Sequence, residues 1–333
     1  MARRIVSFLP SATEMVYALG LGDQLFGVTH ECDYPQPARG KPVVVQSVLP
    51  VERMTEREID AAVAARLGKG LSLYQVDEVR IREIRPDLIL TQDLCQVCAP
   101  SGNEVAKLLT SLSPRPEILW LTPRSIEQIF DNLYQIAKAT GTVARAETLA
   151  AASRERLNRV ATRAAAASTR PRVFCMEWLD PVYCSGHWVP EMVTLAGGRD
   201  SLGRPGEDSV RIPWQEIVAW APEVLVLSPC GFGLAEAVKQ AGLLATYPGW
   251  TELPAVRNGR VYAVDASAYF ARPGPRVVDG TELLAHLIHP GLFAWDGPNG
   301  AFCRLAMTDI AEAARRSDAD EASRGQKERA VGG

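Results

Sequence analysis

The residues with the most reactive side chains are cysteines and histidines, and most of them follow predicted strands. The chain has seven cysteines and four histidines. Ligands of open α/β sheets bind beyond the carboxyl ends of the strands, so segments that directly follow strands are predicted to line a pocket. The alternative interpretation is that the cysteines and histidines fall in these segments by chance. Five cysteines and two histidines fall in such segments: Cys32, Cys95, Cys98, Cys184, Cys230, His30 and His187.

Cys95 and Cys98 have the spacing of a Cys-x-x-Cys pair, which is typical of half a zinc or iron–sulfur site, or of a redox pair. No second pair with standard spacing completes such a site. Cys32, Cys184 and Cys230 are therefore the candidate additional metal ligands, because soft thiolates suit zinc and iron–sulfur clusters.

Aromatic and polar side chains accompany these cysteines in the same segments. His187 lies among Trp178, Tyr183 and Trp188 along the chain. Its imidazole is a candidate ligand contact, or an axial ligand to a metal inside a bound cofactor, and a loop histidine that caps backbone carbonyls is the alternative. The predicted ligand-binding residues are Ser11, His30, Glu31, Tyr34, Gln92, Trp178, His187, Trp188, Phe232 and Tyr269.

Charge and composition argue against several functional classes. Lys and Arg total 36 against 39 Asp and Glu, with a net charge of −3, whereas a protein that binds nucleic acid through its phosphates is normally basic. No apolar run reaches the length of about 18 residues that a membrane span needs. No phosphate loop, dinucleotide fingerprint, nucleophile elbow or HExxH motif occurs. We therefore interpret the chain as a protein that binds a small molecule, with an enzyme as the alternative.

The N-terminal segment indicates a cytosolic protein. Residues 1–4 run directly into residues 5–10, which are predicted to form a strand that ends in a turn. The segment lacks the apolar core of about 7–15 residues that a secretory signal contains. Free thiols, metal ligands or reactive groups are then expected in place of disulfides. An exported form with a further upstream segment is the alternative.

The elements that position these residues are predicted to form two similar α/β lobes. Each lobe contains a helical pattern that ends before a proline, at Pro86 and at Pro222. Proline disfavours helical geometry in the residue before it, which explains both helix ends. Ser11 and Glu14 have the spacing of a capping box, and the N–H groups at that helix start are candidate contacts for a polar ligand. A helical pattern, a Pro-acid turn and a buried strand follow one another at residues 76–84, 85–87 and 88–91, and again at 214–220, 221–223 and 224–228.

A long helical region is predicted to join the lobes. It begins at Thr122 and Pro123, is interrupted at Gly141 and continues from Thr142 to Ala167. The second helix would be roughly 39 Å long, which favours a stiff connection, and an ordinary surface helix is the alternative. The predicted divisions are an N-terminal α/β lobe at 1–122, linking helices at 123–168, a C-terminal α/β lobe at 169–298, and a polar, disordered tail at 299–333.

Three segments, in order, resemble a known family across residues 3–290: RIVSFLPSATE at 4–14, RPDLI at 85–89 and TPRSIE at 122–127. Together they resemble the helical-backbone, class III solute-binding proteins of ABC importers. DYP at 33–35 and RIPW at 211–214 resemble the cobalamin-binding (BtuF-like) branch. The resemblance implies a periplasmic-binding-protein-like fold, in which one long backbone helix joins two Rossmann-like lobes and a cleft between them holds the ligand.

The same resemblance implies that aromatic side chains hold cobalamin or a related corrinoid. By position, the aromatic after the second strand falls at His30 or Glu31, and the late aromatic falls at Tyr269. A tryptophan expected after Leu90 is replaced near Gln92 or Asp93. We therefore expect the ligand to be a cobalamin-like corrinoid or another metal-bearing small molecule. A cytosolic metalloprotein or enzyme, with a zinc or iron–sulfur site in the cleft, is the alternative.

The resemblance also bears on a partner, because family members dock on a permease through a glutamate on each lobe. Near the first docking position the chain has Asp77 and Glu78. Near the second position, residues 270–272 contain no acid. The sequence therefore predicts impaired docking on an ABC permease.

Overall fold

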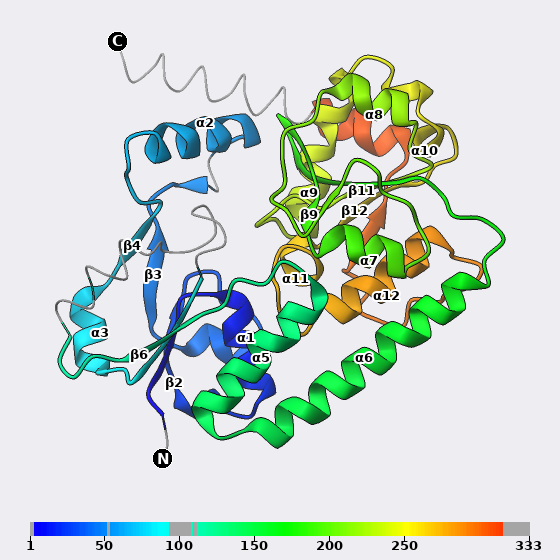
Figure 1. Ribbon diagram of the computed structural model, residues 1–333. Coiled ribbons are helices and arrows are strands. Elements are labelled where there is room, and N and C mark those ends of the chain that lie inside the picture. The colour runs from blue at the N-terminus through cyan, green and yellow to red at the C-terminus, as the bar shows by residue number, and fades with distance from the viewer. Residues whose placement is uncertain (1–2, 52–53, 93–107, 109–111, 316–333) are drawn as a thin grey trace, which may run out of the picture. The chain divides into compact units, whose positions relative to one another are not determined.

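The computed structural model describes residues 3–51, 54–92, 108 and 112–315 (Figure 1). The chain divides into two compact units. Unit 1 comprises residues 1–155 together with 272–275, and unit 2 comprises residues 156–271 together with 276–333. Each unit contains one main β-sheet with helices packed on it, so the predicted α/β class is confirmed.

Unit 1 is built on a six-stranded sheet with the order β4-β3-β2-β1-β5-β6. Neighbouring strands are parallel, except that β4 is antiparallel to β3. The strands are β1 (Ile5–Ser7), β2 (Leu25–Thr29), β3 (Val43–Ser47), β4 (Tyr74–Val76), β5 (Leu88–Thr91) and β6 (Glu117–Trp120). The α-helices are α1 (Pro10–Ala18), α2 (Glu56–Leu67), α3 (Glu78–Ile84) and α5 (Ile126–Thr140).

The central strands of unit 1 are continuous apolar runs because helices cover them. Every residue of β1 and β5 is buried. Helix α3 contributes Ile81 and Ile84 to the same core cluster as Val6 and Ile89. The strand order changes direction at β1, and the carboxyl ends of strands at such a point are where ligands bind in open α/β sheets.

Unit 2 is built on a five-stranded sheet with the order β13-β12-β11-β7-β8. Strands β7, β11 and β12 are parallel, and β8 and β13 are antiparallel to their neighbours. The strands are β7 (Val173–Leu179), β8 (Val182–Cys184), β11 (Val224–Leu227), β12 (Val261–Val264) and β13 (Phe302–Arg304), and a small sheet pairs β9 (Gly186–His187) with β10 (Arg204–Pro205). The α-helices are α7 (Val189–Leu195), α8 (Trp214–Trp220), α9 (Leu234–Gln240), α10 (Pro254–Arg257), α11 (Ala266–Tyr269) and α12 (Val277–Ile288).

Alternate residues of β7 pack in two layers, as expected for a strand that is buried on both faces. Phe174 and Met176 share a core cluster with Ile217 of α8. Val173 lies on the other face, close to Gly198 and to Val193 of α7. Both faces of the sheet are therefore covered, and its carboxyl edge is left to the loops.

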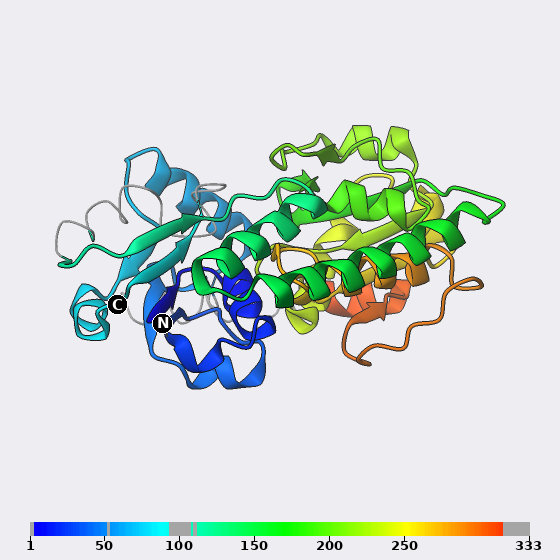
Figure 2. The same cartoon turned by 60° about the horizontal axis from the view of Figure 1, so that its bottom comes forward.

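Helix α6 (Val143–Ala165) runs without interruption and confirms the predicted long helix (Figure 2). The helix before it differs from the prediction. Helix α5 begins at Ile126 and not at Thr122, because the Ser125 hydroxyl accepts the backbone N–H of Gln128 at 3.3 Å. In the same way α3 begins after Asp77, whose carboxylate caps it, and the preceding residues form β4.

The predicted disordered tail at 299–333 is wrong for its first part. Strand β13 pairs antiparallel with β12. Ala301, Leu305 and Ile310 are buried, so apolar residues spaced among polar ones complete the core of unit 2. Residues 316–333 lie outside the described residues.

The two units share one arrangement at the start of their sheets. The backbone N–H of Arg4 donates to the Asp87 carboxylate at 3.2 Å, and the backbone N–H of Arg172 donates to the Glu223 carboxylate at 2.9 Å. Each arginine Nε also donates to a backbone carbonyl at the C-terminal end of a helix, that of Ile84 in α3 at 2.6 Å and that of Ala221 after α8 at 2.9 Å. The predicted repeat is therefore matched at the level of single hydrogen bonds.

Candidate ligand-binding site

The predicted ligand-contacting residues of unit 1 lie at the carboxyl ends of its strands. Ser11 is in the first turn of α1, and Gln92 directly follows β5. Both are buried. His30, Glu31 and Tyr34 follow β2, where His30 is exposed and Tyr34 is 48% exposed. The side chains of His30 and Tyr34 are therefore accessible, whereas Ser11 and Gln92 belong to the interior, and contact of any of them with a ligand stays a prediction.

The capping box predicted for Ser11 and Glu14 is wrong. Helix α1 begins at Pro10 after Leu9, and no side chain caps it. Proline at the first helical position lacks one of the N–H groups that have no partner within the helix, and its fixed φ suits a helix start, so the helix begins before Ser11. Glu14 has a different neighbour, because its carboxylate lies 4.0 Å from the guanidinium of Arg272.

Arg272 is a largely buried cation at this edge of unit 1. Its guanidinium pairs with the Asp33 carboxylate at 2.5 Å and donates to the backbone carbonyl of Glu31 at 2.9 Å. The side chains of Arg272 and Glu14 are only 13% and 3% exposed, so the loop after β2 is held by a largely buried ion-pair network. No local pattern in the sequence indicates this role of Arg272, since the contact joins residues 239 positions apart.

Cys32, a predicted metal ligand, is held by hydroxyl groups. Its Sγ lies 3.1 Å from Thr13 Oγ1 and 3.4 Å from Thr29 Oγ1. Burial raises the pKa of the thiol, although both hydroxyls and the charge of Arg272 act in the opposite direction. The packing of the β2 loop on α1 thus accounts for this residue as a neutral thiol.

Two further residues at this edge were not singled out from the sequence. Trp120 ends β6 and is 40% exposed. Thr91 ends β5, and its buried hydroxyl has no hydrogen-bond partner among the described residues. The signal for Trp120 was its place in the short apolar run of residues 118–121, which lies directly before Thr122.

Two of the predicted aromatic residues of unit 2 meet at the carboxyl edge of its sheet. Trp178 lies near the end of β7 and Phe232 in the loop after β11, with ring centroids 5.4 Å apart and planes inclined at 49°. The backbone N–H of Ser267 donates to the Phe232 carbonyl at 3.1 Å, which ties this loop to the next one. Both rings are half-buried. Such a tilted pair can receive a flat apolar ligand.

The other two predicted aromatic residues are core residues. Trp188 and Tyr269 are 4% and 8% exposed. The indole N–H of Trp188 donates to the backbone carbonyl of Phe270 at 2.9 Å. The ring of Tyr269 meets Trp295 edge-on, with centroids 6.1 Å apart. Their contact with a ligand stays a prediction.

His187 is positioned by a close approach of two backbone segments. Its φ is 52°, in the left-handed region, and its Nε2 lies 3.1 Å from Asp208 Oδ1. A Cβ on the adjacent Gly186 would lie 2.5 Å from the backbone nitrogen of Ser209, so only glycine fits there. The imidazole therefore has a carboxylate partner within its own loop.

Two carboxyl groups hold the same loop from the interior. Glu177 accepts a hydrogen bond from the Ser209 hydroxyl at 2.9 Å. Asp200 accepts the backbone N–H groups of Leu202 and Gly203 at 3.0 and 2.8 Å. Burial raises the pKa of both carboxyls, to about 6 for Asp200. These groups position the loop that carries His187, and no motif in the sequence indicates either of them.

A protein-family model described as periplasmic binding protein matches residues 5–268. That range includes the parallel strands of both sheets and both carboxyl edges described above. The chain belongs to the periplasmic binding protein family. The resemblance to class III solute-binding proteins of ABC importers is thereby confirmed.

Sequence relatives of this periplasmic binding protein include transport and vitamin-binding proteins. An uncharacterised ABC transporter substrate-binding lipoprotein of Bacillus subtilis is 25% identical over 300 residues, which cover 87% of this chain and 81% of the relative. The vitamin B12-binding protein of Vibrio parahaemolyticus is 25% identical over 279 residues, which cover 83% of this chain and 86% of the relative.

Solved structures of periplasmic binding proteins share the fold. A heme-binding protein of Pseudomonas aeruginosa matches with a TM-score of 0.66 and 24% identity, covering 88% of this chain and 94% of the other. The vitamin B12-binding protein BtuF of Vibrio cholerae matches with a TM-score of 0.62 and 23% identity, covering 87% and 97%. These likenesses confirm the predicted fold class.

The predicted metal site is not assembled within the part of the chain that the structure describes, where no group of three or more His, Cys, Asp or Glu side chains could hold a metal ion. Cys184 packs in the core of unit 2, and Cys230 is half-buried after β11. Cys95 and Cys98 lie outside the described residues. A zinc or iron–sulfur site that uses them stays a prediction.

The predicted cytosolic location finds no support among these periplasmic and lipoprotein relatives, and neither does a cytosolic enzyme. Among the described residues, no helix is both long and apolar enough to cross a membrane.

Proposed function

We propose that this periplasmic binding protein binds a cobalamin-like corrinoid or another metal-bearing small molecule. The observation that carries the proposal is the pair of half-buried rings of Trp178 and Phe232 at the carboxyl edge of unit 2. Burying a broad, flat ligand against such rings contributes about 25 cal/mol per Å² of apolar area, before the costs of association. On unit 1, the exposed rings of Tyr34 and Trp120 are further candidate contacts.

The names of the relatives support this class of ligand. The Vibrio parahaemolyticus protein is named for vitamin B12 and the Pseudomonas protein for heme. Both compounds are planar macrocycles that carry a metal. The relatives therefore support a metal-bearing macrocycle as the class of ligand better than they support vitamin B12 or heme individually.

The binding test is a titration of the purified chain with cyanocobalamin, aquocobalamin and hemin, followed by calorimetry, visible absorption and tryptophan fluorescence. We expect at least one of them to bind saturably, with one ligand per chain. Trp178→Ala should weaken that binding by about tenfold, because an aromatic contact is lost. Trp220→Ala is the matched control, since Trp220 is half-buried in α8 and does not lie at the carboxyl edge. The proposal is wrong if none of the three binds at concentrations that saturate the Vibrio cholerae protein.

The proposed role in transport is to deliver this ligand, outside the cytoplasm, to an ABC permease. Asp77 and Glu78 at the start of α3 are the candidate docking acids on unit 1, with side chains 46% and 32% exposed. The second docking position, residues 270–272, contains no acid, so we expect docking to depend mainly on Asp77 and Glu78. Fractionation of cells that express the full-length gene, with the chain detected by antibody, tests the location, and recovery in the cytosolic fraction would contradict it.

A further inference from the structure

Helix α3 carries arginines that its counterpart in unit 2 lacks. Helices α3 and α8 each end in a left-handed residue that is followed by a proline, an acid and a buried strand. Aligned at that turn, Arg82 and Arg85 of α3 correspond to Val218 and Ala221 of α8. The fold therefore does not require arginine at either position, and the repeat provides an internal control.

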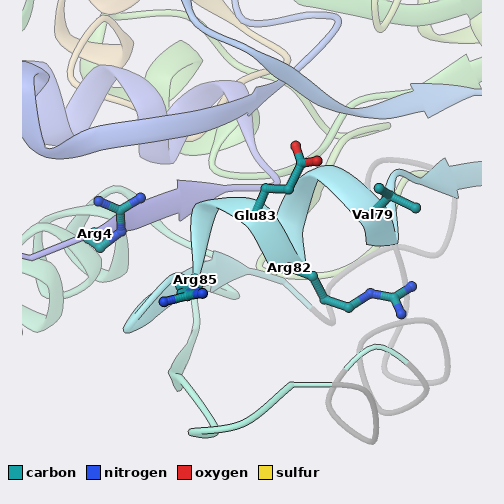
Figure 3. Close-up of a pocket in the computed structure, with 5 residues that line it drawn as sticks. All are labelled: Arg4, Val79, Arg82, Glu83 and Arg85. Atoms are coloured by element: carbon teal, nitrogen blue, oxygen red, sulfur yellow. The ribbon is translucent and has the colours of Figure 1, made fainter.

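These arginines surround an open hollow of about 850 Å³ on unit 1. Three cations and one carboxylate line it, so the hollow carries a net positive charge on a chain whose net charge is −3. Figure 3 shows the lining side chains, which are Arg4, Val79, Arg82, Glu83 and Arg85.

The cations differ in how they are held. The Nε of Arg4 donates to the backbone carbonyl of Ile84 at 2.6 Å, and its guanidinium lies 4.3 Å from the ring centroid of Phe26. The Nε of Arg82 donates to the backbone carbonyl of Glu78 at 3.0 Å, and its guanidinium pairs with the Glu78 carboxylate at 3.4 Å; such exposed contacts are energetically weak. Arg85 is exposed. Arg4 is thus tied to the end of the helix and to an aromatic ring, whereas Arg82 is held only by a residue of its own helix, so Arg82 and Arg85 can reach an external anion.

The directions of the side chains indicate the shape of that anion. Arg82 and Arg85 leave α3 in different directions (Figure 3), so their guanidinium groups do not converge on one phosphate. Val79 beside them is 64% exposed, which makes it the most exposed large hydrophobic side chain among the described residues. Separated cations next to an exposed apolar side chain match an extended anionic surface with an apolar layer beneath it.

We infer that this α3 arginine surface, formed by Arg4, Val79, Arg82 and Arg85, contacts the anionic headgroups of a phospholipid bilayer. The guanidinium groups contact separate headgroup phosphates, and Val79 enters the apolar boundary. Attraction of this kind acts within about 8 Å at physiological ionic strength, so it is weak and salt-dependent. It holds the protein beside the membrane that contains a permease. That consequence rests on the proposed function, whereas the bilayer contact does not.

Cosedimentation of the whole chain with vesicles tests the inference. One set of vesicles contains phosphatidylglycerol mixed with phosphatidylcholine, and the other contains phosphatidylcholine alone. We expect binding only to the anionic vesicles, with loss at high salt. The double variant Arg82→Gln with Arg85→Gln should lower the partition coefficient about 30-fold. The double variant Arg82→Lys with Arg85→Lys should retain most of the binding. Lysine keeps both charges, and the proposed contacts do not require the planar guanidinium group.

The matched control is Arg115→Gln with Arg257→Gln, which removes the same charge from two exposed positions outside this surface. Equal loss of binding in both glutamine pairs would overturn the inference, because net charge alone would then explain it. Competition by inorganic phosphate at constant ionic strength would also overturn it, since that result indicates a single-anion site. Titration of the same variants with cobalamins and hemin separates this outcome from the proposed function, because ligand affinity should not change.

Discussion

Arg85 and Ala221 adopt the same left-handed backbone conformation, with φ of 51° and 50°. Each ends a helix directly before a proline, and its backbone N–H donates to the carbonyl of an isoleucine in the last turn, Ile81 in one unit and Ile217 in the other. Neither residue is glycine, although the left-handed conformation costs other L-residues about 1–2 kcal/mol. Both units therefore accept the same local strain in order to turn the chain into a buried strand.

Ala221→Gly should stabilise the protein, because glycine adopts this conformation without the steric cost. We expect a gain of about 1 kcal/mol in the free energy of unfolding, reduced by the greater entropy of the unfolded chain. Gly141→Ala is the reverse control, since Gly141 has a φ of 73° and a Cβ there would contact nothing within 4 Å. Gly141→Ala should lower the free energy of unfolding by a similar amount. Urea denaturation measures both, and a destabilised Ala221→Gly would contradict the argument.

The repeated turns illustrate what the sequence can predict. Pro86 and Pro222 are local signals, because each restricts the residue before it, and helix ends were therefore expected where they occur. The long helix α6 was predictable for the same reason, since its periodicity is a property of consecutive residues. Ser125 shows the limit of local reasoning, because Thr122 and Pro123 form an equally good start and only the structure shows which hydroxyl caps α5.

Contacts between distant residues could not be predicted. Nothing near Arg272 in the sequence indicates Asp33 or Glu14 as its neighbours. Likewise, the sequence gives Trp178 and Trp188 equal weight, yet the first is half-buried at the sheet edge and the second is a core residue with its N–H satisfied. Residue type identifies side chains able to contact a ligand, but burial decides which of them can.

Arg272→Met should destabilise unit 1. The substitution keeps most of the apolar volume and removes a cation from beside the Glu14 carboxylate, which is 3% exposed. We expect a loss of about 2 kcal/mol, between the values for exposed and buried ion pairs. Adding Glu14→Gln should recover part of the loss, because the buried charge is then removed as well. A double-mutant cycle in urea measures the coupling energy between Arg272 and Glu14. Additive losses in the double variant would contradict a stabilising ion pair between them.

Asp200 should make the stability depend on pH. Its pKa is raised by burial from 3.8 to about 6 in the folded state. A carboxyl with a raised folded pKa contributes stability below its unfolded pKa, and that contribution is lost as the pH rises through the folded value. Between pH 4 and pH 8 the loss is about 2 kcal/mol. Asp200→Asn should remove this dependence, since its side-chain oxygen can still accept the N–H groups of Leu202 and Gly203. Thermal unfolding across this pH range tests it, with the exposed Asp131→Asn as a control that should leave the slope unchanged.

The cysteines should react with alkylating agents in an order set by burial. Cys32, Cys175 and Cys184 are buried, and burial raises the pKa of each thiol, so both access and the thiolate fraction are low. Cys230 and Cys303 are half-buried. Among the five cysteines within the described part of the chain, mass spectrometry after brief treatment of the native protein with iodoacetamide should find modification at Cys230 and Cys303 first. Early modification of Cys175 would show that the core of unit 2 opens readily.

Trp120 should matter for ligand binding without mattering for stability. It ends β6 with 40% of its surface exposed, so truncation leaves no cavity in the core of unit 1. If its ring contacts a macrocycle, Trp120→Ala should weaken binding by about tenfold and Trp120→Phe by less, because a smaller ring keeps part of the contact. Calorimetry with whichever of cyanocobalamin, aquocobalamin and hemin binds the unmodified chain gives the affinities, and thermal unfolding confirms that both variants fold. Unchanged affinity in Trp120→Ala would remove β6 from the binding surface and leave Tyr34 as the aromatic candidate on unit 1.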